Sequence, residues 1–277
     1  MNTDSETLVI VKRRHYGRVV GAAIVLVALA AIVHAFVVGQ IEWTYVGRFL
    51  TVPAIVSGLV NTIVMSILAM LLGLVLGVVF AVMRLSANPV LSTTALGYIW
   101  FFRAIPALLQ LLLWYNLALV FPTVGIPGVA TWKTVEVMTP FVAALLGLGI
   151  QQGAFTAEVV RAGLLSVDQG QYEAAQTIGM TRLQLLRRII MPQAMRVIVP
   201  PVGNEFIGMV KLTSLASVIQ YAEVLHSAQN IYYANSRVIE LLLVAAFWYL
   251  IVVTILSLLQ GRVEAYYERG VARSPGR

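Results

Sequence analysis

Long apolar stretches alternate with short polar segments along most of the chain. The stretch from Ile55 to Met83 contains no charged residue. It is too long for an ordinary core helix and long enough to cross a bilayer, which takes about 20 predominantly apolar residues. Comparable stretches predict membrane-spanning helices at residues 18–39, 55–83, 96–121, 139–161, 197–221 and 238–260. The pattern therefore predicts an all-α integral membrane protein with about six transmembrane helices.

Basic residues lie mainly on one side of these predicted spans. A cluster at residues 12–18 precedes the first span, and the alternation of spans places Arg84, the segment 182–196 and the basic residues after position 260 on the same side. Because loops on the cytoplasmic side carry the excess of Lys and Arg, both termini are predicted to be cytoplasmic. This asymmetry accounts for the formal net charge of +7, so nucleic acid is not a predicted partner.

Glycine and proline residues indicate where the spans pack or bend. Gly73 with Gly77, and Gly149 with Gly153, form two G-x-x-x-G pairs, which allow neighbouring helices to approach closely. The fifth span contains the sequence PPVG at residues 200–203, which is expected to kink or interrupt it. Interrupted spans are typical of transport pathways, because their freed backbone groups need protein or water partners.

The polar segment 164–196, between the fourth and fifth spans, carries its own helix signals. Asp168 is a predicted N-cap of a helix that reaches about residue 178, and Gly179 suits the position after its end. A second short helix is predicted to begin at Thr181 and to end at Pro192. From these residues alone, the segment is either a compact, positively charged connector or a docking element for a partner.

Polar and ionisable residues interrupt the fourth and fifth spans. Such groups are costly in a membrane unless they are paired or face water, so a place on a translocation path is the first hypothesis for them. The alternatives are a structural ion pair within the fourth span and, in the fifth, an interhelical network that holds a dimer together. The candidates for the path are Gln151, Glu158, Arg161, Asn204, Glu205, Lys211 and Ser214.

No motif in the chain predicts catalysis. Hydrophobic residues make up 60% of the sequence and charged residues 11%, which excludes an ordinary soluble globular domain. Cysteine is absent, the histidines are scattered, and no G-x-x-x-x-G-K-[ST] phosphate loop occurs. The chain is therefore predicted not to be an enzyme, and no cofactor or metal site is expected in it.

Several motifs together resemble one family. The sequence E-A-A at 173–175, followed by Gly179 and by Ile-Met-Pro ending at Pro192, resembles the EAA loop of the membrane subunits of bacterial ATP-binding-cassette importers. The stretches GLVNTIVMSILAMLLGLVLGVVFAVMRLS, WFFRAIPALLQLLLWYNL, AFTAEVVRAGLLSVDQGQYEAAQTIGMT and PPVGNEFIGMVKLTSL resemble its polar amino acid permease group. The resemblance covers about residues 55–260. At 104–106 the chain has Ala-Ile-Pro where that group more often has glycine and threonine before the proline.

The resemblance implies a division of the chain. A permease core of five spans would occupy residues 51–262, with the EAA loop at about 164–196. An additional transmembrane helix and a periplasmic connection would occupy residues 18–50. A cytoplasmic segment at 1–17 and a cytoplasmic tail at 263–277 complete the chain.

The resemblance also implies function and partners. The chain would be the permease subunit of an importer in the bacterial inner membrane, moving a polar or charged amino acid into the cytoplasm by alternating access. It would assemble with a second permease subunit, identical or related, with a periplasmic or lipid-anchored amino-acid-binding protein, and with two ATPase subunits that carry ATP and Mg²⁺. The residues that would contact the ATPase are Glu173, Ala174, Ala175, Gly179, Arg182 and Pro192.

Three other classes of membrane protein remain as alternatives. An ion-driven secondary transporter of small polar solutes usually shows internal repeats and carboxylates at mid-membrane, and neither is clear in this sequence. A membrane enzyme needs a convergent cluster of reactive side chains, and a structural scaffold leaves the EAA-like loop unexplained. Co-purification of an ATPase separates the importer from all three.

Overall fold

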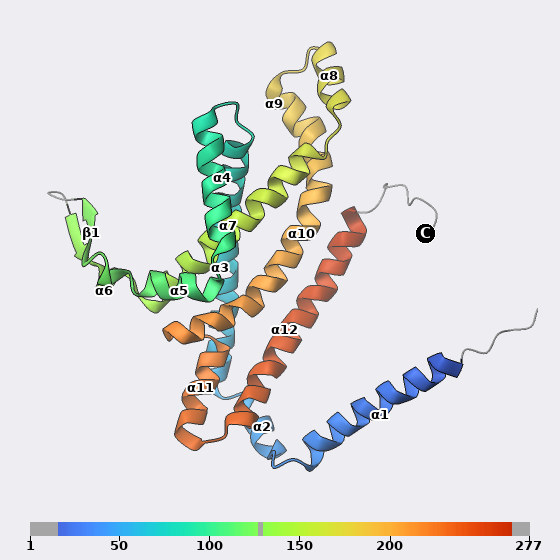
Figure 1. Ribbon diagram of the computed structural model, residues 1–277, viewed down its shortest axis with the longest axis vertical. Helices are drawn as coiled ribbons and strands as arrows, with labels where there is room; N and C mark the ends of the chain where they lie inside the picture. Colours follow the sequence, from blue (N-terminus) through green and yellow to red (C-terminus); the bar gives the residue numbers. More distant parts are fainter. Residues whose placement is uncertain (1–15, 127–129, 268–277) are drawn as a thin grey trace, which may run out of the picture. The chain divides into compact units, whose positions relative to one another are not determined.

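The computed structural model describes residues 16–126 and 130–267. The predicted cytoplasmic segment up to residue 15, and the part of the predicted tail beyond residue 267, lie outside the described residues. The chain divides into a first unit that ends at Trp43 and a second unit that begins at Thr44. The first unit contains one long helix, and the second contains the helical bundle (Figure 1).

The described residues are mostly helical, as the sequence predicts. The helices are α1 (Tyr16–Val38), α2 (Trp43–Phe49), α3 (Pro53–Arg84), α4 (Pro89–Ala104), α5 (Ala107–Tyr115), α6 (Thr134–Val137), α7 (Pro140–Leu165), α8 (Gln169–Thr177), α9 (Arg182–Leu185), α10 (Met191–Leu212), α11 (Val224–Asn235) and α12 (Val238–Tyr267). Short 3₁₀ turns occur at Leu117–Leu119 and Thr213–Ile219, and a π-helical segment occurs at Leu186–Ile190. Five helices in the described chain are long and apolar enough to cross a membrane, or six if the bent pair α4–α5 counts as one span.

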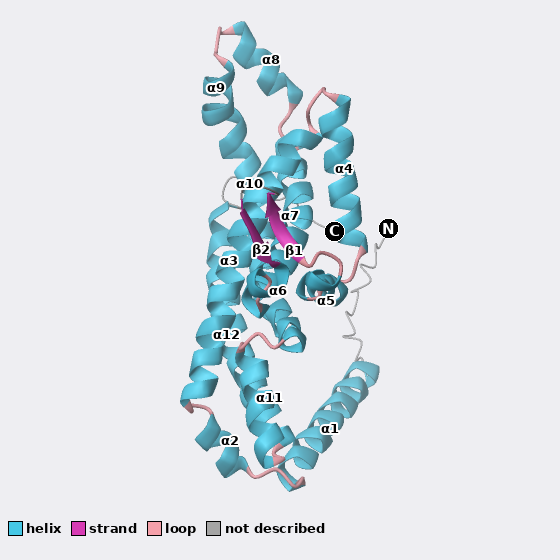
Figure 2. Cartoon of the chain, turned by 90° about the vertical axis from the view of Figure 1, so that its left-hand side faces the viewer, coloured by secondary structure: helices cyan, strands magenta, loops and turns pink. Residues whose placement is uncertain are grey.

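The prediction of an all-α chain needs one correction. Strands β1 (Thr123–Ile126) and β2 (Ala130–Lys133) pair antiparallel as a two-stranded hairpin, followed by the short helix α6 (Figure 2). Gly125 has a φ of +138°, a conformation that only glycine adopts readily. Prediction from hydropathy missed these strands because they are only four residues each.

α3 and α7 pack closely at the predicted glycine pairs. A Cβ atom added to Gly73 would lie 2.6 Å from Cγ of Gln152, and one added to Gly153 would lie 2.7 Å from Cβ of Leu76. Without side chains at these positions the two backbones approach closely, which gains dispersion contacts that a lipid environment does not otherwise provide. All four predicted glycines lie in this interface: Gly73, Gly77, Gly149 and Gly153.

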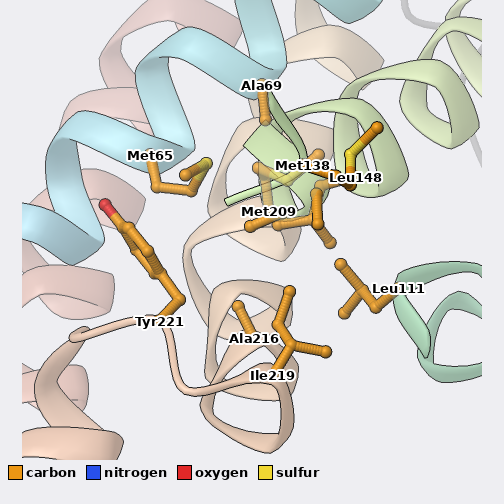
Figure 3. Packing of buried hydrophobic residues seen from close by; sticks show 11 residues of the cluster. Met65, Ala69, Leu111, Met138, Leu148, Met209, Ala216, Ile219 and Tyr221 are labelled. Atoms are coloured by element: carbon orange, nitrogen blue, oxygen red, sulfur yellow. The ribbon is translucent and has the colours of Figure 1, made fainter. Parts of the chain in front are cut away.

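A buried apolar cluster lies beside this interface, where α3, α5, α7 and α10 meet (Figure 3). Met65, Leu111 and Leu148 are each fully buried within it. Its buried members are Met65, Ala69, Leu111, Met138, Ala143, Ala144, Leu148, Met209, Ala216, Ile219 and Tyr221. The cluster joins residues far apart in the sequence and fixes the positions of the helices that carry the polar residues described below.

The predicted span 96–121 is not a single straight helix. α4 ends at Ala104 and α5 begins at Ala107, and the two are bent by 101° at the break (Figure 1). Pro106 has no N–H group and disfavours a helical conformation at the residue before it, and Ile105 accordingly has a ψ of 131°. The predicted span is therefore a pair of helices bent at the proline, and the count of six spans stays a prediction that depends on counting this pair as one.

The bend frees backbone carbonyl groups, and a buried glutamine binds them. Nε2 of Gln110 donates to the carbonyl oxygens of Phe102, at 3.0 Å, and Ile105, at 2.9 Å. We expect Gln110→Leu to lower the stability of the purified protein by about 1–2 kcal/mol, because these hydrogen bonds are lost inside the protein. Thermal unfolding in detergent measures this effect. The control is Asn116→Leu, which removes an exposed amide that donates to the carbonyl oxygen of Leu112 four positions earlier. Equal shifts for the two variants would contradict the prediction.

The prolines of α10 do not interrupt it. The helix runs from Met191 to Leu212 through Pro200 and Pro201. The predicted interruption at residues 200–203 therefore does not occur, and the alternative, a kink, stays a prediction. Nε2 of Gln260, on α12, donates to the carbonyl oxygen of Pro200 at 2.8 Å. This bond joins α10 to α12 beside the two prolines.

Pro192 does not end its helix either, contrary to the prediction. α9, the π-helical segment Leu186–Ile190 and α10 continue as one helix as far as Ile219. Pro192 cannot donate to the carbonyl group four residues before it, and a wider π turn is a common way to accommodate such a missing bond. The turn therefore replaces the predicted helix end.

α11 lies at the opposite end of the bundle from helices α8 and α9 (Figure 1), and a buried glutamate joins it to α12. Glu223, which is fully buried, caps α11 by accepting hydrogen bonds from the backbone N–H groups of Leu225 and His226, and the hydroxyl group of Tyr249 donates to it at 2.6 Å. Burial raises the pKa of Glu223 above its ordinary value, and these three hydrogen bonds act in the opposite direction. Glu223 thus joins α11 to α12.

Candidate functional site

The predicted first helix between the fourth and fifth spans is α8. Oδ1 of Asp168 accepts a hydrogen bond from the N–H group of Gly170 at 2.7 Å, which confirms Asp168 as the N-cap. After α8, Gly179 has a φ of +74°, and the N–H group of Met180 donates to the carbonyl oxygen of Ala175 at 3.0 Å. The predicted glycine turn is confirmed, and it sets the direction in which the chain continues.

The second helix begins with a reciprocal cap. Oγ1 of Thr181 accepts from the N–H group of Gln184 at 3.3 Å, and Oε1 of Gln184 accepts from the N–H group of Thr181 at 2.9 Å. This is the capping box that stabilises a helix start. We call residues 166–190 the α8–α9 loop.

The six positions predicted to contact an ATPase differ in exposure. Ala175 is only 1% exposed and packs in a cluster with Val167, Leu185 and Ile190. Its side chain therefore supports the α8–α9 loop from inside. The other five positions are exposed: Glu173, Ala174, Gly179, Arg182 and Pro192.

A polar cluster joins α7 to α10 inside the bundle. Oε2 of Glu205 accepts hydrogen bonds from Nε2 of Gln152, at 2.7 Å, and from Oγ1 of Thr156, at 3.0 Å. In residues 16–126 and 130–267, Glu205 forms no ion pair, although Arg103 acts on it electrostatically. Two donors hold the carboxylate in place without neutralising it.

Glu158 and Arg161 form an ion pair within α7. Nη2 of Arg161 lies 2.7 Å from Oε2 of Glu158, and both side chains are partly exposed. This is the structural pair that the sequence left open as an alternative to a path role. Gln151 is buried, and its Nε2 lies 3.4 Å from the carbonyl oxygen of Ile105 at the bend between α4 and α5.

The remaining path candidates do not share one cluster. Nδ2 of Asn204 donates to Oε1 of Glu264, on α12, at 2.9 Å, so Asn204 belongs to an interhelical contact. Lys211 is exposed, and its amino group has no partner in the part of the chain that the structure describes. The hydroxyl group of Ser214 donates to the carbonyl oxygen of Lys211 at 2.8 Å.

Prediction from the sequence missed the partners of these residues. Gln152 and Thr156 lie four positions apart on α7, so their shared face was readable, but their pairing with Glu205 joins segments about fifty residues away. Glu264 is the acidic partner of Asn204 and also accepts from Gln260 at 3.0 Å. In the described ranges, no group of three His, Asp or Glu side chains is placed to hold a metal ion.

A family model settles what kind of protein carries this arrangement. Residues 73–269 match the family described as "Binding-protein-dependent transport system inner membrane component", which is well over half of the chain. The chain is a member of this family. The permease therefore belongs to the ATP-binding-cassette importers of the inner membrane, and its long apolar helices make it a multi-pass protein there.

Individual relatives narrow the likeness within the family. The permease is 39% identical over 264 residues to the arginine transport system permease protein ArgU of Corynebacterium glutamicum, a match that covers 94% of this chain and 83% of the relative. It is 37% identical over 194 residues to the L-cystine transport system permease protein TcyB of Bacillus subtilis, which covers 70% and 77% of the two chains. The predicted resemblance to polar amino acid permeases is thus confirmed.

A solved structure agrees with the fold. The permease aligns with a chain of an amino acid ABC transporter crystallised with histidines, at a TM-score of 0.67 and 34% identity, covering 77% of this chain and 94% of the other.

The match to ArgU covers 94% of the permease, so it reaches into α1, whereas the family model begins only at residue 73. The region of α1 is therefore shared with at least one relative.

Proposed function

We propose that the permease is the membrane subunit of an ATP-driven importer of polar or charged amino acids, and that the α8–α9 loop couples it to a separate ATPase. The observation that carries the coupling is the loop itself, which is a capped pair of short helices between α7 and α10. Four of the predicted contact positions are exposed on it, and the fifth exposed position, Pro192, follows at the start of α10. The names of its relatives, which include arginine and cystine permeases, support amino acids as the substrate class.

The proposed division of labour follows from the sequence. The permease lacks a phosphate loop, so ATP and Mg²⁺ bind to two partner ATPases. Two permease subunits surround the path, and an amino-acid-binding protein delivers substrate from the periplasm. The proposed core occupies residues 51–262, and residues 18–50 provide an additional span and its periplasmic connection.

Alternating access then needs two states with different affinities for ATP. ATP binding favours closure of the ATPase pair and an outward-facing permease, and hydrolysis with product release favours the inward-facing state. The ligand shifts the equilibrium only by its difference in affinity for the two states. Movement of the ATPases reaches the permease through the exposed positions Glu173, Ala174, Gly179 and Arg182, while Ala175 keeps the loop in shape and Pro192 lies at the start of α10.

Glu205 and Lys211 are the proposed contacts of the substrate. An amino acid carries an ammonium and a carboxylate group, and both need partners when they leave water. Glu205 offers a carboxylate without an ion pair, and Lys211 offers an amino group without a partner among the described residues. Glu158 is the weaker candidate, because Arg161 already neutralises it. Gln151, Asn204 and Ser214 are proposed to line or support the path.

The experiment that tests the proposal is ATP hydrolysis by the reconstituted complex. We expect the permease to co-purify with an ATPase, and we expect hydrolysis to rise when the cognate binding protein is loaded with one amino acid of a panel. Transport that follows an ion gradient and needs neither ATP nor an ATPase would instead support the secondary transporter.

The coupling role predicts the effect of a charge reversal in the loop. Glu173→Lys is expected to lower ATPase co-purification and transport at least about tenfold, because an exposed contact position changes from acidic to basic, and like charges facing each other at an interface cost several kcal/mol. Amounts of permease in the membrane should not change. The matched control is Glu136→Lys, the same reversal at an exposed carboxylate of α6. Unchanged co-purification and transport in Glu173→Lys would rule out the coupling assignment.

A further inference from the structure

A cavity lies away from the proposed path, between α10 and α12. Its volume is about 510 Å³, and it is lined by Pro192, Met195, Arg196, Tyr266 and Tyr267. The lining combines a cation, two phenol hydroxyl groups and apolar side chains. Of the predicted ATPase-contact positions, Pro192 lines it, and the Glu205 cluster does not.

The charge around this cavity is positive. Arg196 is exposed and has no hydrogen-bonding or ionic partner in residues 16–126 and 130–267. Arg262 lies one helical turn before Tyr266 and is also exposed. The nearby acid is Glu264, and its Oε1 already accepts hydrogen bonds from Asn204 and Gln260. An anion entering the cavity would therefore find an unneutralised guanidinium group, which binds phosphate in a bidentate manner.

The depth of the cavity in the membrane follows from helix length. α12 contains 30 residues, or about 45 Å of helix, and the hydrocarbon core is about 30 Å thick. α12 is therefore about 15 Å longer than the core, and with the cytoplasmic C-terminus that the basic residues predict, we place its last turns, where Tyr266 and Tyr267 lie, at the level of the lipid headgroups. Tyrosine and arginine are favoured at this depth, because their apolar parts face the acyl chains and their polar ends face water.

We propose that the α10–α12 cavity binds the phosphate group of an anionic phospholipid headgroup. Arg196 is the cationic contact, and the hydroxyl groups of Tyr266 and Tyr267 are hydrogen-bond donors. Met195 and Pro192 accommodate the adjoining apolar part of the lipid. Free inorganic phosphate shares the same recognition chemistry, and the experiment separates the two sources. The site is independent of which substrate the permease carries.

The test measures lipid retained by the complete transporter complex. Wild-type complex, purified with its ATPase, is exchanged into phosphatidylglycerol or phosphatidylcholine, and bound lipid is counted by native mass spectrometry. We expect Arg196→Gln to weaken phosphatidylglycerol retention at least about fivefold, which is the scale of one basic residue at a membrane surface. Phosphatidylcholine retention should fall less, because its headgroup carries a phosphate group but no net negative charge. Tyr266→Phe combined with Tyr267→Phe should give a smaller loss, because the rings remain.

Arg188→Gln is the matched control. It removes the same charge eight residues earlier in the same continuous helix but does not line the cavity. Equal losses in the two arginine variants, or full retention in Arg196→Gln, would overturn the proposal. Competition by millimolar inorganic phosphate would confirm the phosphate chemistry and assign the site to the free ion, and the absence of competition would assign it to lipid. If Arg196→Gln fails to assemble, Arg196→Lys replaces it in the test. Lysine keeps the charge but loses the bidentate geometry, so we expect an intermediate loss of phosphatidylglycerol. Retention at the wild-type level in Arg196→Lys would count against the site.

Discussion

Gly153→Val is expected to remove most of the assembled transporter from the membrane. A Cβ atom at position 153 would lie 2.5 Å from the hydroxyl oxygen of Tyr98 and 2.7 Å from Cβ of Leu76. Tyr98 cannot move aside freely, because it donates to the carbonyl oxygen of Ile150 at 2.6 Å and stacks on Phe80 at 3.7 Å between ring centroids. α3 and α7 would have to separate, and overpacking of this kind costs about 1–3 kcal/mol or more.

The measurement is the yield of the ATPase-bound complex after size-exclusion chromatography, and we expect at least about a tenfold fall. Gly97→Val is the matched control, because a Cβ atom at Gly97 meets nothing within 4 Å. Both variants place the same β-branched residue in a helix. If both complexes assemble in equal yield, close approach of α3 and α7 is not required.

The second large effect is expected for Glu205→Gln. The amide keeps an oxygen that can accept from Gln152 and Thr156, so the contact between α7 and α10 is preserved. The negative charge is lost, and with it the proposed partner of the substrate cation. Transport should fall on the order of 100-fold, the scale at which a buried charge loses its partner, while assembly and ATP hydrolysis without substrate remain.

Gln152→Leu separates the two interpretations of this cluster. It removes one donor to Glu205 and leaves the carboxylate in place. If the cluster serves only as an interhelical network, Gln152→Leu should impair transport at least as strongly as Glu205→Gln. If Glu205 binds substrate, transport in Gln152→Leu should exceed that in Glu205→Gln by at least about tenfold. Substrate stimulation of ATP hydrolysis, measured in parallel, shows whether the loss arises at the substrate step.

Local signals in the sequence were sufficient for part of this structure. Gly153 and its neighbours predicted a close helix contact, because glycine at four-residue spacing lets two helix backbones approach each other. Asp168, Gly179 and Thr181 predicted the α8–α9 loop correctly, since helix caps depend on bonds between residues two to five positions apart. Hydropathy predicted the long spans, because every segment that crosses lipid must be apolar and must satisfy its own backbone groups, whatever its neighbours in the bundle are.

The predictions that failed in the spans concern residues whose effect depends on their surroundings in the folded chain. Pro106 breaks its helix, whereas Pro192, Pro200 and Pro201 do not. The difference lies in what surrounds each proline, such as the π turn before Pro192 and the amide of Gln260 beside Pro200. The hydrogen bonds of Glu205 were unpredictable for the same reason, because they join residues about fifty positions apart.

The helix that runs through Pro192 has a mechanical consequence. On one side the α8–α9 loop runs without a break into the bundle, because Arg182 to Ile219 form one continuous helix of 38 residues. On the other side α7 stops at Leu165, and three non-helical residues separate it from α8. A push on the loop would then travel into the bundle along a stiff lever, and Ser166 to Asp168 would serve as the pivot. The two legs of the loop are thus unequal, and in the proposed coupling force would enter the membrane mainly through the leg that continues into α10.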